Sequence, residues 1–187
     1  RFACSCDEYR PAWDRIKSIE YVRTDFFDDL HVPGEEHYRA QGFWNHNTGK
    51  SNGVAYTLWK LCRKHAQARI LVLRTSRTLL TDTFCKTFEE DVCPGDDCLG
   101  GGNRLNRHEY VFPNGSRIVL GGLDDQNRYY GSDWDMIVLE EAVQFRWKDV
   151  EPFLGSLRNG KMGFHAMIYA TNPDAPANWV NKRAEAG

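Results

Sequence analysis

The sequence predicts an α/β domain with a mainly parallel sheet, preceded by a shorter all-β segment. From residue 48 onward, helix-like and strand-like stretches alternate, which is the pattern of parallel sheets. Residues 69–74 and 136–139 are short apolar runs, as expected of strands buried on both faces. The first 47 residues instead carry short β-like runs separated by turns such as Pro33-Gly34.

The expected elements follow one another without repeats or low-complexity segments. A turn at Asn114-Gly115 predicts a β-hairpin. This hairpin spans residues 108–122, and the glycine-rich stretch 98–103 predicts a loop. The apolar patterns of the other stretches predict helices over 49–66, 76–92, 147–158 and 175–186 and strands over 69–74, 135–142 and 164–173.

Composition excludes some classes of protein. The chain has 187 residues, a net charge of −2 and no apolar run near the ~18–20 residues of a membrane span, so we expect no membrane partner. A DNA contact would need a local basic patch, because the slightly negative overall charge does not attract DNA. Cys4-x-Cys6 and Cys93-x4-Cys98 lack the two-residue spacing of zinc sites, so we expect reduced thiols.

Residues 48–51, Thr-Gly-Lys-Ser, match the end of a phosphate-binding Walker A loop. The pattern G-x-x-x-x-G-K-[ST] requires glycine at position 44, where this chain has Trp44. Glycines there let backbone amides close around phosphate, and an indole would obstruct them. The loop therefore ends as expected but does not begin as expected.

Polar residues follow two of the predicted strands. Glu140 and Glu141 end the apolar run at 136–139, which is typical of a Walker B tip, where one acid organises Mg²⁺ and the next activates the attacking water. Thr171 and Asn172 end the later strand, where such ATPases sense the γ-phosphate. The alternatives are an exposed acidic strand end and a plain Asx turn before Pro173.

The N-terminal segment resembles the C-terminal end of an intein, a self-splicing element. The resemblance is carried by Asp-Leu-His-Val-Pro-Gly at 29–34, by Tyr38-x-Ala40-x-Gly42, and by His46-Asn47 before Thr48. It implies a HINT-like all-β splicing fold over residues 1–47. The alternative is a β-hairpin domain that ends in His-Asn-Thr by chance.

The resemblance to inteins also implies a chemistry. Asn47 would cyclise and cleave its own peptide bond, His46 would assist as a general acid, and the Thr48 hydroxyl would accept the upstream flank. One position departs from the pattern, because Glu36 stands where inteins of this type usually carry histidine and His37 follows it.

An intein at this place would explain Trp44. The missing glycines and the first strand would then lie on the upstream flank, and the partners implied are that flank and the intein's N-terminal half. Because the chain starts at Arg1, we expect a fragment of a longer product.

The remainder, residues 48–187, resembles the ATPase domain of the large terminase subunit of tailed bacteriophages. The stretches that carry this resemblance are Gly-Lys-Ser, 69–84, 112–125, 134–142 and 170–183. This resemblance implies a P-loop NTPase fold of the additional-strand type, a missing C-terminal nuclease domain, and activity in the host cytoplasm. The implied ligands and partners are ATP, Mg²⁺, double-stranded viral DNA, the portal protein, the small terminase subunit and further copies in a homo-oligomeric ring.

The resemblance to terminases implies roles for individual residues. Thr48, Gly49 and Lys50 would bind the phosphates, Ser51 and Glu140 would hold Mg²⁺, Glu141 would be the catalytic base, and Thr171-Asn172 would be the coupling motif. Arg128 is the candidate arginine finger, with a plain surface arginine as the alternative. Arg104 and Arg107 could touch DNA, but solvated surface is the favoured expectation for each.

Two other functions remain open at this point. One is another intein-bearing P-loop ATPase, such as a helicase or recombinase. The other is a non-functional prophage remnant that acts at most as a binding module.

Overall fold

The computed structural model describes residues 37–40, 43–46, 50–95, 97–99, 103–172 and 177–186. Its main feature is a five-stranded sheet with the order β4-β5-β3-β6-β7. Four strands run parallel, and β4 pairs antiparallel with β5 at one edge. The strands are β3 (Arg69–Arg74), β4 (Glu109–Val111), β5 (Arg117–Gly122), β6 (Met136–Glu140) and β7 (Ala166–Ala170). The mainly parallel sheet is confirmed.

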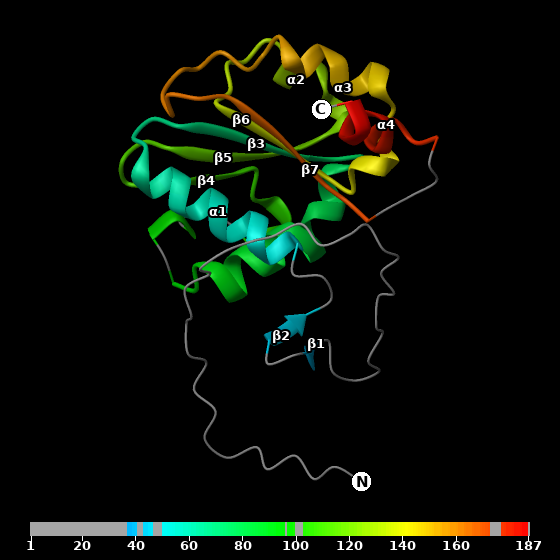
Figure 1. The fold of residues 1–187 in the computed structure, drawn as a ribbon. Coiled ribbons are helices and arrows are strands. Elements are labelled where there is room, and N and C mark those ends of the chain that lie inside the picture. The colour runs from blue at the N-terminus through cyan, green and yellow to red at the C-terminus, as the bar shows by residue number, and fades with distance from the viewer. Residues whose placement is uncertain are drawn as a thin grey trace, which may run out of the picture.

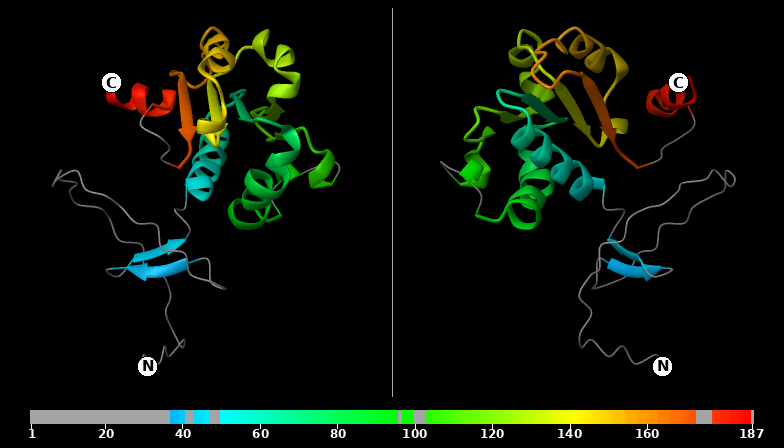
Figure 2. Two further views of the ribbon diagram at one scale, coloured as in Figure 1. Left: turned by 90° about the vertical axis from the view of Figure 1, so that its right-hand side faces the viewer. Right: turned by 60° about the vertical axis from the view of Figure 1, so that its left-hand side comes forward.

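Helices cover both faces of this sheet (Figures 1 and 2). One face carries α1 (Lys50–Lys64) and two π-helical segments, and the other carries α2 (Asn127–Tyr130) and α3 (Trp147–Leu154). The remaining helical elements are η4 (Asp97–Leu99), η5 (Arg104–Asn106), η6 (Leu123–Asp125), η7 (Ala142–Gln144) and α4 (Trp179–Ala186). None of the described helices is long and apolar enough to cross a membrane.

Alternation along the strands builds two separate cores. Val72 and Val138 belong to the core on the α1 face, whereas Leu73 and Leu139 belong to the core on the α2 and α3 face. Because side chains of a strand point alternately to its two faces, the continuous apolar runs of β3 and β6 supply both cores.

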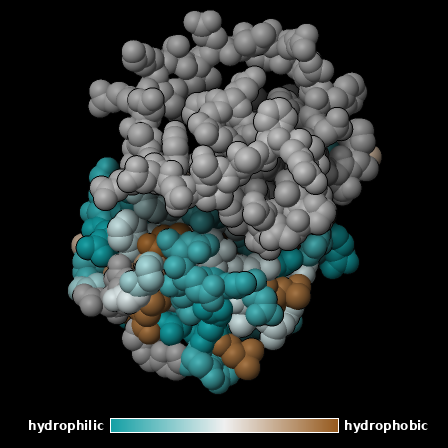
Figure 3. All heavy atoms as spheres, turned by 90° about the horizontal axis from the view of Figure 1, so that it is seen from below, coloured by the Kyte–Doolittle hydropathy of each residue, from teal (hydrophilic) through white to brown (hydrophobic). Residues whose placement is uncertain are grey.

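Helix α1 follows the apolar spacing that predicts it. Its buried residues, Ala55, Leu58 and Cys62, recur every three or four positions and lie on one face. Its last turn carries Arg63 and Lys64, whose charges stabilise a helix C-terminus. Seen from below, the described surface is mainly hydrophilic, with small separate hydrophobic patches (Figure 3).

The predicted hairpin is confirmed. Gly115 has φ +84°, a conformation that favours glycine, and its N–H donates to the Phe112 carbonyl at 2.9 Å. The Asn114 side chain donates to the Cys62 carbonyl at 2.7 Å, which fixes the turn against the end of α1.

The helix predicted over 76–92 has a different internal geometry. It consists of a 3₁₀ segment, η1 (Arg77–Leu80), followed by two π-helical segments, η2 (Thr81–Cys85) and η3 (Phe88–Val92). The Cys93 N–H donates five residues back, to the Phe88 carbonyl at 3.0 Å. Phe88 packs against both Phe84 and Tyr110, with ring centroids 5.6 and 4.5 Å apart, so aromatic packing accompanies the widened turns.

The N-terminal part contains one described hairpin. Strands β1 (His37–Ala40) and β2 (Phe43–His46) pair antiparallel, with His37 opposite His46. The β-like runs expected between residues 16 and 32 lie outside the described residues, so the all-β fold of residues 1–47 stays a prediction.

Candidate functional site

The predicted site residues lie at the carboxyl ends of the parallel strands. Because these strands run in one direction, their carboxyl ends meet at one edge of the sheet, where α/β proteins bind ligands. Arg74 ends β3, Glu140 ends β6 and Ala170 ends β7, with Glu140 opposite Ala170 in the register. Lys50 begins α1 at this edge, as its contact with Asn172 shows.

The predicted phosphate-binding lysine and the predicted sensor are in contact. The Lys50 ammonium donates to the Asn172 side-chain oxygen across 122 residues of sequence. The contact joins the start of α1 to the end of β7. The structure thus brings together two of the site residues that the sequence predicted separately.

Glu140 is a buried acid, with 3% of its surface exposed. Burial raises its pKa, against the lowering effects of the Arg74 guanidinium and of a hydrogen bond from Ser51. One carboxylate oxygen, Oε1, is buried and has no hydrogen-bond partner among the described residues. Ser51 and Glu140 therefore lie in contact, and the Glu140 Oε1 atom can still accept a bond.

Glu141 has an unusual backbone. Its φ of +54° and ψ of +53° are left-handed, which for a residue with a side chain costs about 1–3 kcal/mol. This conformation ends β6 and starts η7, where the Gln144 N–H donates to the Glu141 carbonyl at 2.9 Å. Such strain recurs at functional sites, and here it falls on the predicted catalytic base.

Thr171 connects the two strand ends. Its hydroxyl oxygen accepts from the Val143 N–H at 3.4 Å, and the hydroxyl donates to the Asn172 carbonyl at 3.2 Å. The predicted coupling pair is thereby bonded to the segment that directly follows Glu141.

The sequence analysis missed two residues beside Glu140. The Arg74 guanidinium donates to the Thr83 hydroxyl at 3.0 Å and to the Leu79 carbonyl at 3.3 Å. Both Arg74 and Thr83 lower the pKa of Glu140. The sequence contained a signal that could have identified Arg74. An arginine at the carboxyl end of an apolar parallel strand lies at the same sheet edge as the acids that end the other parallel strands.

Arg128 is not brought to this group of residues. It is 65% exposed, lies 3.9 Å from Asp125, and lines a cavity of about 310 Å³. The same cavity is lined by Arg69 and Arg117, the first residues of β3 and β5, whereas Glu140 is the last residue of β6. Its role as an arginine finger stays a prediction.

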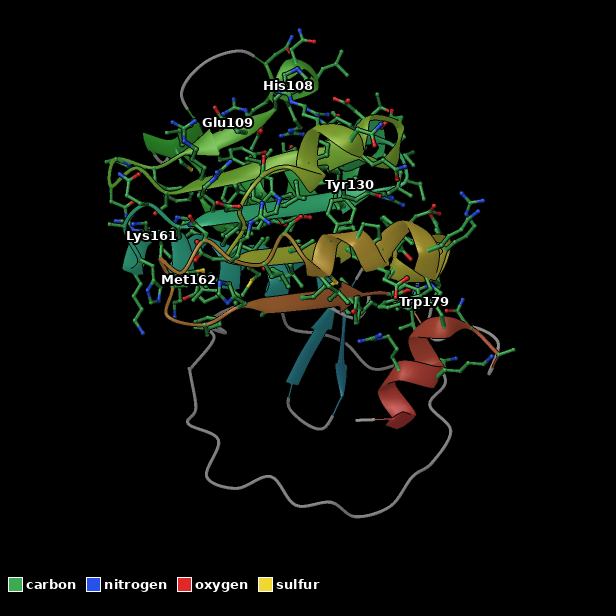
Figure 4. All side chains as sticks on the ribbon, turned by 90° about the horizontal axis from the view of Figure 1, so that it is seen from above. His108, Glu109, Tyr130, Lys161, Met162 and Trp179 are labelled. Atoms are coloured by element: carbon green, nitrogen blue, oxygen red, sulfur yellow. The ribbon has the colours of Figure 1, made fainter. Side chains whose placement is uncertain are left out.

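His108 and Glu109, which also line that cavity, lie at the β4 edge of the sheet. Figure 4 shows them at the opposite edge from Trp179, which lies beside β7.

Arg104 and Arg107 differ from the expectation of solvated surface. Arg104 bonds to Glu89 and Glu90 at 3.0 and 2.8 Å, and Arg107 lies 3.3 Å from Glu89. These pairs join Arg104 of η5 and Arg107, which follows η5, to the acids of η3, so both arginines take part in ion pairs within the domain.

The junction residues cannot be placed in the same way. His46 ends β2, while Asn47, Thr48, Gly49 and Glu36 lie outside the described residues. Their predicted roles in splicing and phosphate binding stay predictions.

Four cysteines lie in the described part of the chain, where all are buried and none forms a disulfide: Cys62, Cys85, Cys93 and Cys98. Over the same residues, no three histidine, cysteine or acidic side chains are grouped so that they could hold a metal.

A mainly parallel sheet with a lysine, a serine and an acid gathered at its carboxyl edge is the arrangement of P-loop nucleotide-binding proteins. The family model of the phage terminase large subunit matches residues 44–185, so the chain belongs to that family. The matched range includes residues 44–47, which the sequence analysis assigned to the intein segment, so the boundary between residues 47 and 48 stays a prediction. No curated protein sequence matches the chain.

Solved structures of other terminases resemble the chain. The large terminase of a thermophilic bacteriophage superposes with a TM-score of 0.54 at 13% identity, over 71% of this chain and 32% of that one, and it agrees in fold. The large terminase ATPase domain of Thermus phage P74-26 gives a TM-score of 0.47 at 14% identity, over 70% of this chain and 57% of that one. The chain spans about a third of the first of these two proteins.

Proposed function

We propose that this chain is part of a terminase large subunit whose ATP hydrolysis drives double-stranded viral DNA into procapsids in the host cytoplasm. The family membership supports this, and it favours a terminase over the helicase or recombinase that the motifs alone left open. The portal protein, the small terminase subunit and a homo-oligomeric ring belong to the same proposal.

The residues fit a magnesium nucleotide. Mg²⁺ prefers hard oxygen ligands, and the Ser51 hydroxyl and the unpaired, buried Glu140 Oε1 are such ligands. These two residues would hold the ion, which neutralises the charge that develops during phosphoryl transfer. Thr48, Gly49 and Lys50 would bind the phosphates through backbone amides and the ammonium group.

Glu141 would act as the catalytic base that orients and deprotonates the attacking water. Thr171 and Asn172 would report the state of the site. Asn172 accepts from Lys50 in this structure, so a phosphate that draws the ammonium group away releases Asn172. Thr171 carries that change to the Val143 N–H, two residues after the base.

One observation carries the proposal: Lys50 and Asn172 meet at the strand edge where Ser51 and Glu140 lie. In the complete enzyme, Lys50→Ala should abolish ATP binding measured by calorimetry. Lys60→Ala is the control, because its ammonium group lies over the Tyr56 ring elsewhere on α1. Full ATP binding by the Lys50→Ala enzyme would contradict the assignment.

We also propose that the N-terminal segment is the end of an intein that splices at Asn47–Thr48. The Walker A loop interrupted at this bond supports it, as does a β-hairpin that ends at His46, one residue before the junction. Splicing would join the upstream flank to Thr48 and complete the loop, and this activity would distinguish the chain from a non-functional remnant.

The splicing proposal is tested by adding the intein's other half with its flank and weighing the products by mass spectrometry. A ligated product through Thr48 and an excised piece ending at Asn47 are expected. Thr48→Ala should stop ligation but permit cleavage, and His46→Ala should slow cleavage by about 10²–10⁴-fold. If a folded wild-type mixture leaves the chain whole, the proposal is wrong.

A further inference from the structure

The sheet is open at β7. This strand pairs with β6, and no other described strand adjoins it. Its sequence, Ala-Met-Ile-Tyr-Ala, has none of the charges or prolines that protect exposed edges. All five of its residues are half-buried, whereas every residue of β6 is buried. Strand β7 thus has the composition of an interior strand and the exposure of an edge.

A groove of about 320 Å³ runs along this edge, between β7 and α1. Most of its walls are apolar, and its lining includes Lys50, Gly53, Val54, Thr57, Ile168 and Ala170. Lys50 lies at the end where the phosphate loop enters α1. The groove offers a strand both an apolar surface and a row of backbone partners.

The connections of the sheet determine where the strand before α1 belongs. Connections that step toward β7, from β5 to β6 and from β6 to β7, cross the face that carries α2 and α3. The connection that steps away, from β3 to β5, crosses the opposite face through η2 and η3. The crossovers therefore share one hand, as parallel sheets require.

Helix α1 lies on the same face as η2 and η3 and leads into β3. If the crossover through α1 has the same handedness as the others, the strand that precedes α1 must lie on the β7 side of β3. Strands β6 and β7 already fill the nearer positions there. The remaining position is the outer edge of β7 (Figure 1), and the groove lies along this edge.

We propose that this edge and groove bind, as an added parallel strand, the terminase segment that precedes the phosphate loop, before any peptide bond joins that segment to Thr48. The inference rests on the split loop proposed above. A parallel strand placed there ends at the same sheet edge as β7, beside Lys50 and the start of α1. The two pieces of the enzyme would associate through its own sheet, which brings the ends to be ligated together.

The experiment uses the whole 187-residue chain and one probe, a synthetic peptide of the twenty residues encoded immediately before the intein. At ten times its Kd, the peptide should slow hydrogen exchange of the β7 amides about tenfold. An upstream sequence without an apolar run and a glycine-rich end would contradict the split loop itself. A suitable peptide that does not bind would overturn the docking alone.

Matched variants locate the binding. Gly53→Leu places a side chain in the groove, and a Cβ at Gly53 meets no atom within 4 Å, so the variant should fold and lose the peptide. Ile168→Lys should also lose it. Val111→Lys, on the exposed opposite edge at β4, should keep it.

Three further results would overturn the docking. The first is binding that survives both groove variants, and the second is binding that the Val111→Lys control abolishes as well. The third is a dimer of the free chain with protected β7 amides, which would make a second copy the occupant of the edge.

Discussion

Replacing Glu140 by glutamine should stabilise the isolated chain at neutral pH. Glu140 is 3% exposed, and its pKa is raised above the ordinary 4.5 because burial disfavours the carboxylate more than Arg74 and Ser51 favour it. A neutral side chain of the same shape avoids that cost. The acid would be retained for Mg²⁺ binding, at the expense of stability.

The sign of the pH dependence follows from the direction of the shift. Above pH 4.5 the unfolded chain has released the proton, while folded Glu140 keeps it until the pH passes its raised pKa. The wild-type free energy of unfolding should fall in this window by about 1.4 kcal/mol per pH unit. Glu140→Gln lacks this slope, so its advantage should grow with pH and level off above the folded pKa.

The assay is urea unfolding of both chains between about pH 4.5 and 7.5 without divalent metal. Glu109→Gln is the control, because that carboxylate forms an exposed pair with Arg117, which is worth under about 1 kcal/mol at any pH. An advantage of Glu140→Gln that does not depend on pH would refute the reasoning, as would a loss of stability at neutral pH.

Three further outcomes are expected. Asp135→Ala should cost about 3 kcal/mol in urea unfolding, because this buried carboxylate accepts from the backbone N–H groups of Arg69, Lys161 and Met162; a loss under about 1 kcal/mol would contradict it. Glu141→Gly should gain about 0.5–1 kcal/mol by relieving a left-handed φ, and no gain would remove the argument from strain. In the complete enzyme, Glu141→Gln should bind ATP almost normally in calorimetry but abolish phosphate release, and retained turnover would show that the base is misassigned.

The sheet was predictable because its strands carry local signals. Short apolar runs such as those of β3 and β6 form either a strand or a buried helix segment, and runs of five or six residues favour a strand. The hairpin was predictable from Asn114-Gly115, since Gly115 takes a positive φ. Glu140 could be placed at the carboxyl edge of the sheet because it ends the apolar run of β6.

Other features depend on contacts that no local pattern encodes. The π-helical turns of η2 and η3 share their apolar spacing with an ordinary helix and coincide with the packing of Phe88 on Tyr110. Arg104 could not be assigned from sequence, because its acidic partners lie 14 and 15 residues away. Thr83 is one hydroxyl among several in its segment, and only the fold places it beside Glu140.

The most direct test of the central claim compares ATP turnover before and after joining. The 187-residue chain alone should bind ATP poorly and hydrolyse it negligibly, because the splicing proposal places the upstream amides of the phosphate loop on a flank not yet joined to Thr48. The product ligated at Thr48 should turn over in an Mg²⁺-dependent way, at roughly the 1–10³ s⁻¹ of ordinary enzymes. Robust turnover by the unjoined chain, or none by the folded, ligated product, would contradict the account.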